Sequence, residues 1–177
     1  MKRRPFVALA LGAVACALLS WRPSPPRLMW NTTSSVPIGA YWLRPPDALQ
    51  VGDIVAVDPP PPVARWLATR GLLPAGVPLL KPVAGLPGQV VCRTGDFVTI
   101  DGKTIGQARE RDRLGRPLPR WSGCHRLAQD ELFLMNAQTA ASFDGRYFGV
   151  TRRADVQARA ERWGGPSDDR RRTEGRP

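Results

Sequence analysis

Histidine is almost absent from this chain, and cysteine is scarce. Among 177 residues there are one histidine and three cysteines. Cys92, Cys124 and His125 offer only three candidate metal ligands, and an adjacent Cys-His pair is poorly spaced for chelation, so we expect no zinc site and no cofactor. A Ser-His-Asp triad through His125 stays open, but the chain lacks a Gly-x-Ser-x-Gly elbow, and we interpret His125 first as a surface residue.

Excess charge is also scarce in the middle of the chain. The formal net charge is +11, yet residues 1–27 hold five basic residues and no acid, and residues 152–177 hold eight arginines against five acids. A nucleic-acid-binding domain needs its basic surface on the folded body, and the body has no recognisable nucleic-acid motif. We therefore expect no nucleic-acid partner. No internal repeat is found, and the length suits one domain with tails.

One long apolar run is present, at the N-terminus. Residues 6–21 are almost wholly apolar and follow a Lys-Arg-Arg cluster within residues 1–5. This pattern predicts a cytoplasmic basic end and an N-terminal membrane helix that places the rest of the chain outside. The run is short against the roughly 20 residues of a spanning helix, but flanking arginines can snorkel. An uncleaved anchor is favoured, with a cleaved signal peptide and a lipoprotein site at Cys16 as alternatives.

Residues 22–30 form a proline-rich spacer, and the domain beyond it, residues 31–151, is predicted to be mainly β. Runs of aromatic and β-branched residues predict strands at 39–43, 53–57, 79–83, 89–91, 97–100, 103–105, 131–135 and 147–150. Asp101-Gly102 supplies the positive φ values of a two-residue hairpin turn. We expect an antiparallel β-barrel or β-sandwich with one short helix at 63–70 and a loop at 106–123.

The C-terminal segment 152–177 loses the apolar pattern. We predict a basic, disordered tail, with a short helix at 153–163 as the one ordered element.

Two of the cysteines lie in the part of the chain that we expect to be exported. Disulfides persist outside the cytoplasm, so Cys92 and Cys124 are candidates for a bridge. The bridge would close a loop of 33 residues, which the chain-entropy relation values at roughly 3–4 kcal/mol. Two buried free thiols are the alternative.

A serine in a turn and a lysine in an apolar run are the candidates for catalysis. Serine is a poor nucleophile without a base. Lysine can be that base only if desolvation makes it neutral near pH 7. Lys81 lies within Leu79-Leu-Lys-Pro-Val83, whereas Lys103 follows a hairpin turn and should be solvated. The ordinary interpretations are a turn residue for Ser35 and a snorkelling side chain for Lys81.

Three segments strengthen the catalytic interpretation. They are Asn31-Thr-Thr-Ser-Ser-Val-Pro-Ile-Gly-Ala-Tyr41, Leu80-Lys-Pro-Val-Ala-Gly-Leu-Pro-Gly88 and Ser142-Phe-Asp-Gly-Arg-Tyr-Phe-Gly149. In this order they resemble the nucleophile, lysine and final boxes of the type I signal peptidase superfamily. The likeness is strongest to the TraF-type peptidases of the conjugal-transfer branch and spans roughly residues 5–151.

The resemblance implies a Ser/Lys dyad. Ser35 would be the nucleophile and Lys81 the general base. The backbone N–H of Ser35 and the hydroxyl of Thr33 would form the oxyanion hole. The Ser-x-Pro spacing of the conjugal branch selects Ser35, whereas the Ser-x-x-Pro spacing of the secretory branch would select Ser34.

The final box implies supporting roles. Ser142 would orient the Lys81 amine, and Asp144 and Arg146 would support the site as an ion pair. The chain departs from the family pattern at two further positions: Pro82 stands where arginine is usual, and Gly145 stands where serine is usual.

The resemblance implies a membrane-anchored serine endopeptidase with its catalytic domain in the periplasm, held to the bacterial inner membrane by a single N-terminal anchor. Its partner would be a membrane-bound precursor, such as a prepilin in conjugative transfer, with small residues before the scissile bond. The acyl-enzyme would be released by water or by the substrate's own N-terminus, which would give a cyclic product. A general type I signal peptidase and a non-enzymatic, membrane-tethered β-domain are the alternatives. A self-cleaving Ser/Lys repressor is disfavoured by the apolar N-terminus.

Overall fold

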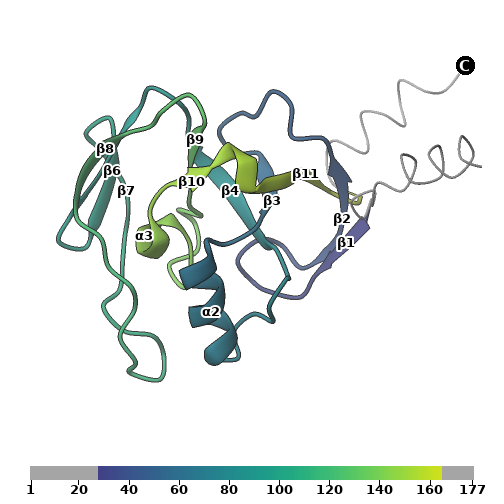
Figure 1. The fold of residues 1–177 in the computed structure, drawn as a ribbon, viewed down its shortest axis with the longest axis horizontal. Coiled ribbons are helices and arrows are strands. Elements are labelled where there is room, and N and C mark those ends of the chain that lie inside the picture. Colours follow the sequence, from purple (N-terminus) through teal and green to yellow (C-terminus); the bar gives the residue numbers. More distant parts are fainter. Residues whose placement is uncertain (1–27, 165–177) are drawn as a thin grey trace, which may run out of the picture.

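Short apolar runs separated by proline and glycine fold into antiparallel sheets (Figure 1). The structure is a computed structural model, and it describes residues 28–164. The predicted basic end at 1–5 and membrane segment at 6–21 lie outside the described residues, as does the choice between anchor, signal peptide and lipoprotein. Within residues 28–164 no helix is long and apolar enough to cross a bilayer.

Seven strands form the larger sheet, in the order β1-β2-β11-β3-β4-β9-β10. Their bounds are β1 Leu28–Asn31, β2 Gly39–Arg44, β3 Ile54–Val57, β4 Leu79–Gly85, β9 Glu131–Leu134, β10 Thr151–Arg152 and β11 Val156–Arg162. Each pair of neighbours in this sheet is antiparallel.

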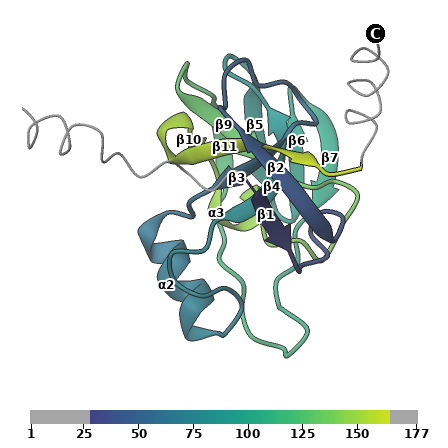
Figure 2. The ribbon, with the colours of Figure 1, turned by 90° about the vertical axis from the view of Figure 1, so that its right-hand side faces the viewer.

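A second sheet has the strand order β7-β6-β5-β8 and is also antiparallel. It contains β5 Val90–Thr94, β6 Phe97–Ile100, β7 Lys103–Gln107 and β8 Gly123–Arg126. The predicted hairpin between β6 and β7 is confirmed, and both of its turn residues have positive φ, 50° at Asp101 and 78° at Gly102. Figure 2 shows the strands of both sheets gathered into one β body, which confirms the mainly β class.

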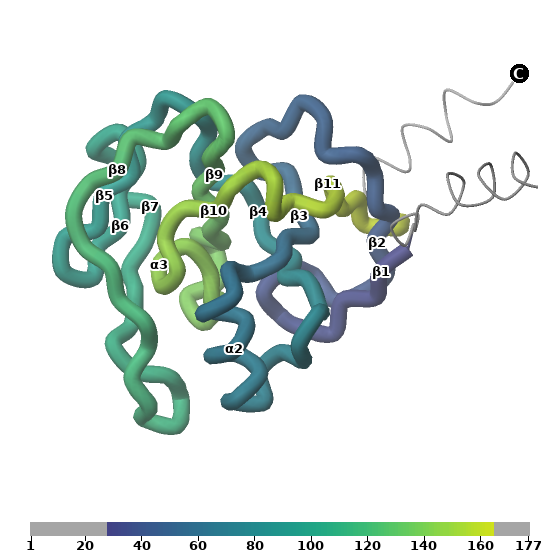
Figure 3. Tube along the Cα trace, viewed as in Figure 1, coloured from purple at the N-terminus to yellow at the C-terminus, as the bar shows by residue number. Residues whose placement is uncertain are grey.

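One helix lies at the edge of this body (Figure 1). Helix α2 (Pro61–Thr69) begins in a run of prolines, which preset the first helical turn. It ends before Gly71, whose φ of 65° side chains disfavour, and the short helix predicted at 63–70 is confirmed with a start two residues earlier. In Figure 3, α2 and the long loop between β7 and β8 extend from the same side of the sheets.

Apolar side chains of the strands form the core; buried positions alternate along β11 and are consecutive along β3 and β9. Val55, Val57, Val83 and Leu132 form part of one core cluster in the larger sheet. A second cluster joins the two sheets, because Val91 and Val98 of the smaller sheet pack with Phe133 and Met135, from β9 and the residue after it. Strand β4 therefore lies in the interior, with β3 on one side and β9 on the other.

The smaller sheet carries the disulfide. Cys92 on β5 and Cys124 on β8 are direct partners in the register of the two strands. Their sulfur atoms are bonded, with the Cα atoms 4.0 Å apart. The bridge joins β8 to the sheet at the end of the long loop, although every residue of β8 is exposed.

The predicted domain boundaries are wrong at both ends. Strand β11 lies between β2 and β3, so the first part of the tail predicted from 152, with its helix at 153–163, is instead a 3₁₀ turn (Arg153–Asp155) and a strand inside the sheet. The rest of that tail, residues 165–177, lies outside the described residues. Val156, Ala158 and Ala160 are buried and alternate with polar residues. Small alanines between charged neighbours gave too weak an apolar signal. At the other end β1 includes residues 28–30 of the predicted spacer.

The strand predicted at 147–150 is also wrong. Residues Gly145–Phe148 form helix α3, so the body has two α-helices and not one. Asp144 caps it by accepting a hydrogen bond from the Arg146 backbone N–H. The aromatic pair Tyr147-Phe148 suggested a strand, but the cap decides the local conformation.

Lysine substitutions on β11 test its place in the fold. Ala158 is 2% exposed, while the adjacent Gln157 is exposed and faces the other way. We expect Ala158→Lys to lower the free energy of unfolding by more than about 3 kcal/mol, because it buries an unpaired charge.

Gln157→Lys is the matched control and should change stability by less than about 0.5 kcal/mol. Urea unfolding followed by circular dichroism measures both. Equal stability of the two variants would contradict a structural role for β11.

Candidate active site

Lys81 is the centre of the candidate site because its amine is buried in the sheet. It occupies β4 opposite Val55 of β3, and it is 2% exposed. Burial lowers the pKa of Lys81 from its ordinary value of 10.5 to about 8; the nearby Asp144 opposes this shift, and Arg146 adds to it. At pH 7 about a tenth of the molecules would then carry a neutral amine, which can accept a proton.

Ser142 orients that amine. Lys81 Nζ donates a hydrogen bond of 3.0 Å to Ser142 Oγ, and Ser142 is itself 2% exposed. The segment that carries Ser142 follows β9, the neighbour of β4, so the sheet brings together residues that are 61 positions apart in the chain. The geometry agrees with the orienting role that the sequence resemblance implied for Ser142.

Arg146 and Asp144 hold this segment in place. The guanidinium is 1% exposed and makes two 2.8 Å bonds to the Asp144 carboxylate. It also donates to the backbone carbonyls of Asn136, Thr139 and Ser142. Removing one partner of such a buried pair typically costs about 3–5 kcal/mol, because the other charge is left uncompensated.

The turn that carries Ser35 is shaped by Asn31, a residue that the sequence interpretation did not single out. Asn31 is buried, and its amide nitrogen donates to the carbonyls of Thr33, Val36 and Pro37. Tyr41 adds a 2.6 Å hydrogen bond from its hydroxyl to the Pro37 carbonyl. These bonds satisfy the backbone of an irregular turn and fix its shape.

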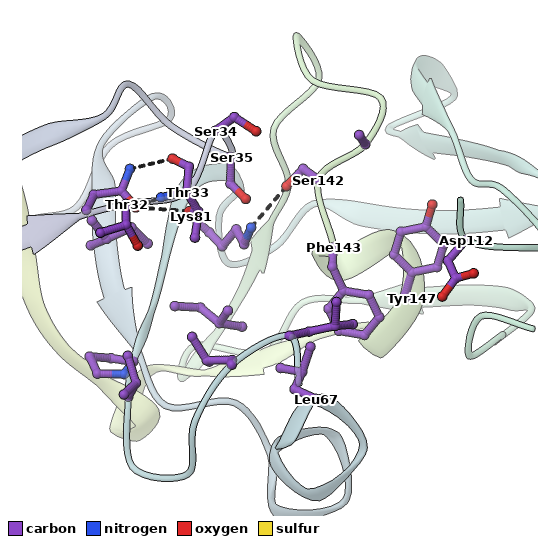
Figure 4. Close-up of a pocket in the computed structure, with 18 of the residues that line it drawn as sticks. Thr32, Thr33, Ser34, Ser35, Leu67, Lys81, Asp112, Ser142, Phe143 and Tyr147 are labelled. Carbon is purple, nitrogen blue, oxygen red and sulfur yellow. Dashed lines mark hydrogen bonds between the residues drawn. The ribbon is translucent and has the colours of Figure 1, made fainter. Parts of the chain in front are cut away.

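Ser35 and its neighbour Ser34 differ in exposure and direction. Ser35 is half-buried, and Figure 4 shows its hydroxyl turned toward Lys81, whereas Ser34 is exposed and its hydroxyl points away. Both residues line the same cavity as Lys81. The arrangement favours Ser35 as the partner of the lysine.

Thr33, expected to supply an oxyanion-hole donor, is engaged elsewhere in this structure. Its hydroxyl and its backbone N–H both donate to Asn31 Oδ1, at 2.9 and 3.1 Å. The Thr33 hydroxyl would have to exchange that partner for the substrate oxyanion.

Asn136 connects the two halves of the site and was also missed by the sequence interpretation. Its side-chain amide donates a 2.5 Å hydrogen bond to the backbone carbonyl of Ser35. Its own backbone N–H donates to Asp144 Oδ2 at 3.1 Å. Asn136 thus joins the Ser35 turn to the segment that orients Lys81. A lone asparagine after a strand has no sequence signal that would have revealed this role.

Gly145 departs from the family pattern for a local steric reason. A Cβ atom added there would lie 2.7 Å from the Leu134 carbonyl oxygen and 2.8 Å from Cε2 of Phe133. The Phe133 ring, which also contacts Trp121 edge-on, occupies the space that a serine would need.

His125 lies outside the candidate site. Its Nε2 is 2.6 Å from Glu131 Oε2, and neither residue lines the cavity. Within residues 28–164 no cluster of three or more His, Cys, Asp or Glu side chains could hold a metal ion.

A cavity of about 480 Å³ opens beside Ser35 and Lys81. Its lining includes Leu67 of α2, Phe143 and Tyr147, together with residues of the loop between β7 and β8. This volume is in the range of sites that bind drug-sized ligands. It can accommodate a short peptide segment next to the serine.

The chain belongs to the signal peptidase family, peptidase S26. The model of that family, described as "Signal peptidase, peptidase S26", matches residues 3–163.

Two curated relatives are both named "Plasmid transfer protein TraF" and come from Escherichia coli. One is 29% identical over 164 residues, covering 88% of this chain and 92% of the relative. The other is 29% identical over 157 residues, covering 84% and 89%. Among solved structures, a signal peptidase I from Enterococcus faecalis aligns with 20% identity and a TM-score of 0.37, covering 64% of this chain and 97% of that one. The predicted family resemblance is confirmed.

Lys81→Met tests the desolvation of the lysine without any assay of activity. On unfolding, the lysine regains its ordinary pKa of 10.5, so between pH 8 and 10.5 the unfolded chain keeps a proton that the folded protein has lost. Wild-type stability therefore rises with pH across that window. The methionine variant should exceed wild type by about 3 kcal/mol below pH 8, and the gain should shrink toward pH 10.5.

Lys103→Met is the control, since Lys103 is exposed at the start of β7. It should show no such dependence on pH. A gain for Lys81→Met that is equal at pH 7 and pH 10.5 would contradict a desolvated amine.

Asn136 variants test the link between the two halves of the site. Asn136→Asp keeps the shape but loses the donor to the Ser35 carbonyl, so kcat should fall about 10–100-fold with little change in KM, because the nucleophile is misplaced. Gln138→Ala, an exposed neighbour, is the control. A variant with normal kcat and a lower unfolding temperature would show that Asn136 only stabilises the fold.

Proposed function

We propose that the chain is a membrane-anchored serine endopeptidase that cleaves exported precursors with a Ser35–Lys81 dyad. The observation that carries the proposal is the buried Lys81 amine, which shares a cavity with Ser35 and is oriented by Ser142. A serine needs a base in its own site, and a lysine becomes one only when it is desolvated. Membership of the signal peptidase family supports the same reaction.

The reaction would proceed in two steps. Neutral Lys81 takes the proton of Ser35 Oγ as the oxygen attacks a peptide carbonyl, and the resulting oxyanion is stabilised by the Ser35 N–H and the Thr33 hydroxyl. Lys81 then returns the proton to the leaving amine, and an acyl-enzyme forms. Water, activated by the neutral lysine, completes hydrolysis. If the precursor's own N-terminal amine attacks instead, the product is a ring.

The substrate we propose is a membrane-bound precursor with small residues before the scissile bond, such as a prepilin. Its extended backbone would pair with a strand edge beside Ser35. The two relatives named plasmid transfer proteins support a role in conjugative transfer. The apolar segment at residues 6–21 supports an anchor in the inner membrane, with the catalytic domain in the periplasm.

Three substitutions test the dyad. Ser35→Ala and Lys81→Ala should each abolish cleavage of a co-expressed precursor, because one removes the nucleophile and the other its base. Ser34→Ala should retain activity, since its hydroxyl points away from Lys81 (Figure 4). Mass spectrometry of the precursor reports the cleavage position and distinguishes a linear from a cyclic product.

The pH dependence of kcat/KM also tests whether Lys81 is the base. With a pKa of about 8 for Lys81, kcat/KM should rise about tenfold per pH unit below pH 8 and level off above it. A flat profile from about pH 5 to pH 9 would exclude the lysine as the base. If only Ser34→Ala abolishes activity, the nucleophile is Ser34 and not Ser35.

A further inference from the structure

The cavity beside Ser35 extends into a groove with two protruding walls. One wall is α2 and the segment after it, including Leu67, Leu72 and Val77; the other is the loop between β7 and β8, residues 108–122. Figures 1 and 3 show these two parts extending from the same side of the sheets. The groove therefore reaches beyond the position where the bond is cut.

Aromatic contacts hold both walls. Trp66 of α2 stacks on Phe143 with ring centroids 4.8 Å apart, and Phe143 stacks on Tyr147 at 5.3 Å. The Tyr147 hydroxyl accepts a hydrogen bond of 3.1 Å from the backbone N–H of Arg109, in the other wall. Because Phe143 directly follows Ser142 in the chain, the groove and the segment that contacts Lys81 form one preformed unit, which lowers the entropic cost of binding.

The walls expose apolar side chains that a peptide could cover. Leu72 is 48% exposed, Val77 is 40% exposed, and Leu114 at the tip of the loop is 74% exposed. All three line the groove. Apolar side chains of a bound segment would remove this surface from water.

The loop wall adds positive charge that the protein itself does not neutralise. Three of its arginines are engaged: Arg111 donates to the Gly115 carbonyl, Arg116 pairs with Asp112 at 2.7 Å, and Arg120 lies 3.7 Å from Glu110. The remaining two, Arg109 and Arg113, have no side-chain partner among residues 28–164.

Both of these arginines line the groove, together with Arg116, whose guanidinium is paired with Asp112. Asp112 is the one acidic residue of the described chain in that lining, and it is already paired with Arg116. The groove thus presents two uncompensated guanidinium groups above an apolar floor. A guanidinium binds a carboxylate through two parallel hydrogen bonds, which gives both strength and direction.

We propose that Arg109 and Arg113 select precursors that carry a carboxylate near the scissile bond, next to apolar side chains. This rests on the proposed peptidase function and adds a substrate class to it. The carboxylate is either an acidic side chain or the C-terminus of the precursor, since both offer the same group. A peptide is favoured over an anionic lipid because the arginines face a groove that is continuous with Ser35.

Binding to the inactive Ser35→Ala protein, as the full-length chain in detergent, tests this without turnover. The probes are labelled alanine-rich peptides with one glutamate moved along either side of the scissile position, their glutamine counterparts, and both free-acid and amidated C-termini. On one side of the bond, carboxylate peptides should bind roughly 3- to 10-fold tighter than neutral ones. The preference should shrink when salt rises from about 50 mM to about 300 mM.

Substitutions then assign the preference to the two arginines. Adding Arg109→Gln and Arg113→Gln to the Ser35→Ala protein should abolish the preference for carboxylate peptides. Adding Arg109→Glu and Arg113→Glu should instead produce a preference for lysine peptides. Arg111→Gln is the matched control in the same loop and should keep it. Circular dichroism melting of each variant verifies the fold.

The outcomes separate this inference from the proposed function. Equal binding of acidic and neutral peptides at every position would overturn the carboxylate preference. A second result would also overturn it: the glutamine variants lose binding to anionic lipid vesicles while their peptide preference stays unchanged. That result would mean that the arginines bind the membrane. If the active protein cleaves neutral and acidic peptides alike, the peptidase function stands and only the inference falls; if it cleaves none, the function itself falls.

Discussion

The candidate site is built around one buried amine. Lys81 lies on β4 between two other strands and is only 2% exposed, through the cavity that it shares with Ser35. The loss of hydration lowers its pKa to about 8, although Asp144 pulls in the opposite direction. An unpaired Asp144 carboxylate would favour the charged form of Lys81 and raise its pKa. Arg146 binds both of its oxygens, so the pair can support the site structurally while exerting little net attraction on the amine.

Two buried polar side chains determine where the reacting groups lie. Asn31 donates hydrogen bonds to the backbone carbonyls of the Ser35 turn, and Arg146 donates to those of the segment around Ser142. Asn136 bridges the two systems through the Ser35 carbonyl. A fully satisfied polar network in a low-dielectric interior is rigid, because breaking any member leaves a buried group unpaired. The Ser35 turn and the segment that contacts Lys81 are therefore positioned by hydrogen bonds to backbone.

The sequence predicted the parts of the fold that have strong local signals. The Asp101-Gly102 turn, the short helix predicted at 63–70 and the valine-rich strands appear as expected. Strand β11 did not, because alanine at Ala158 and Ala160 fills a crowded interior without a marked apolar pattern. Helix α3 was missed because a cap by Asp144 outweighed the strand preference of aromatic residues. At the site, the boxes pointed to Ser35, Lys81 and Ser142, but Asn31 and Asn136 act through geometry that only the folded chain contains.

A peptide bound in the groove can change the pKa of Lys81. Tyr147, Phe143 and Leu67 line the cavity that holds Lys81, so a peptide segment in the groove would displace water from the same space. Removing that water would lower the lysine pKa below its value in the free protein, because the charged amine loses its remaining hydration. A segment with apolar side chains displaces more water than a polar one, whereas its carboxylate, if held by Arg109 and Arg113, stays paired and away from the amine. Substrate recognition would then contribute to catalysis by making the base more often neutral, which is a stronger coupling than positioning alone.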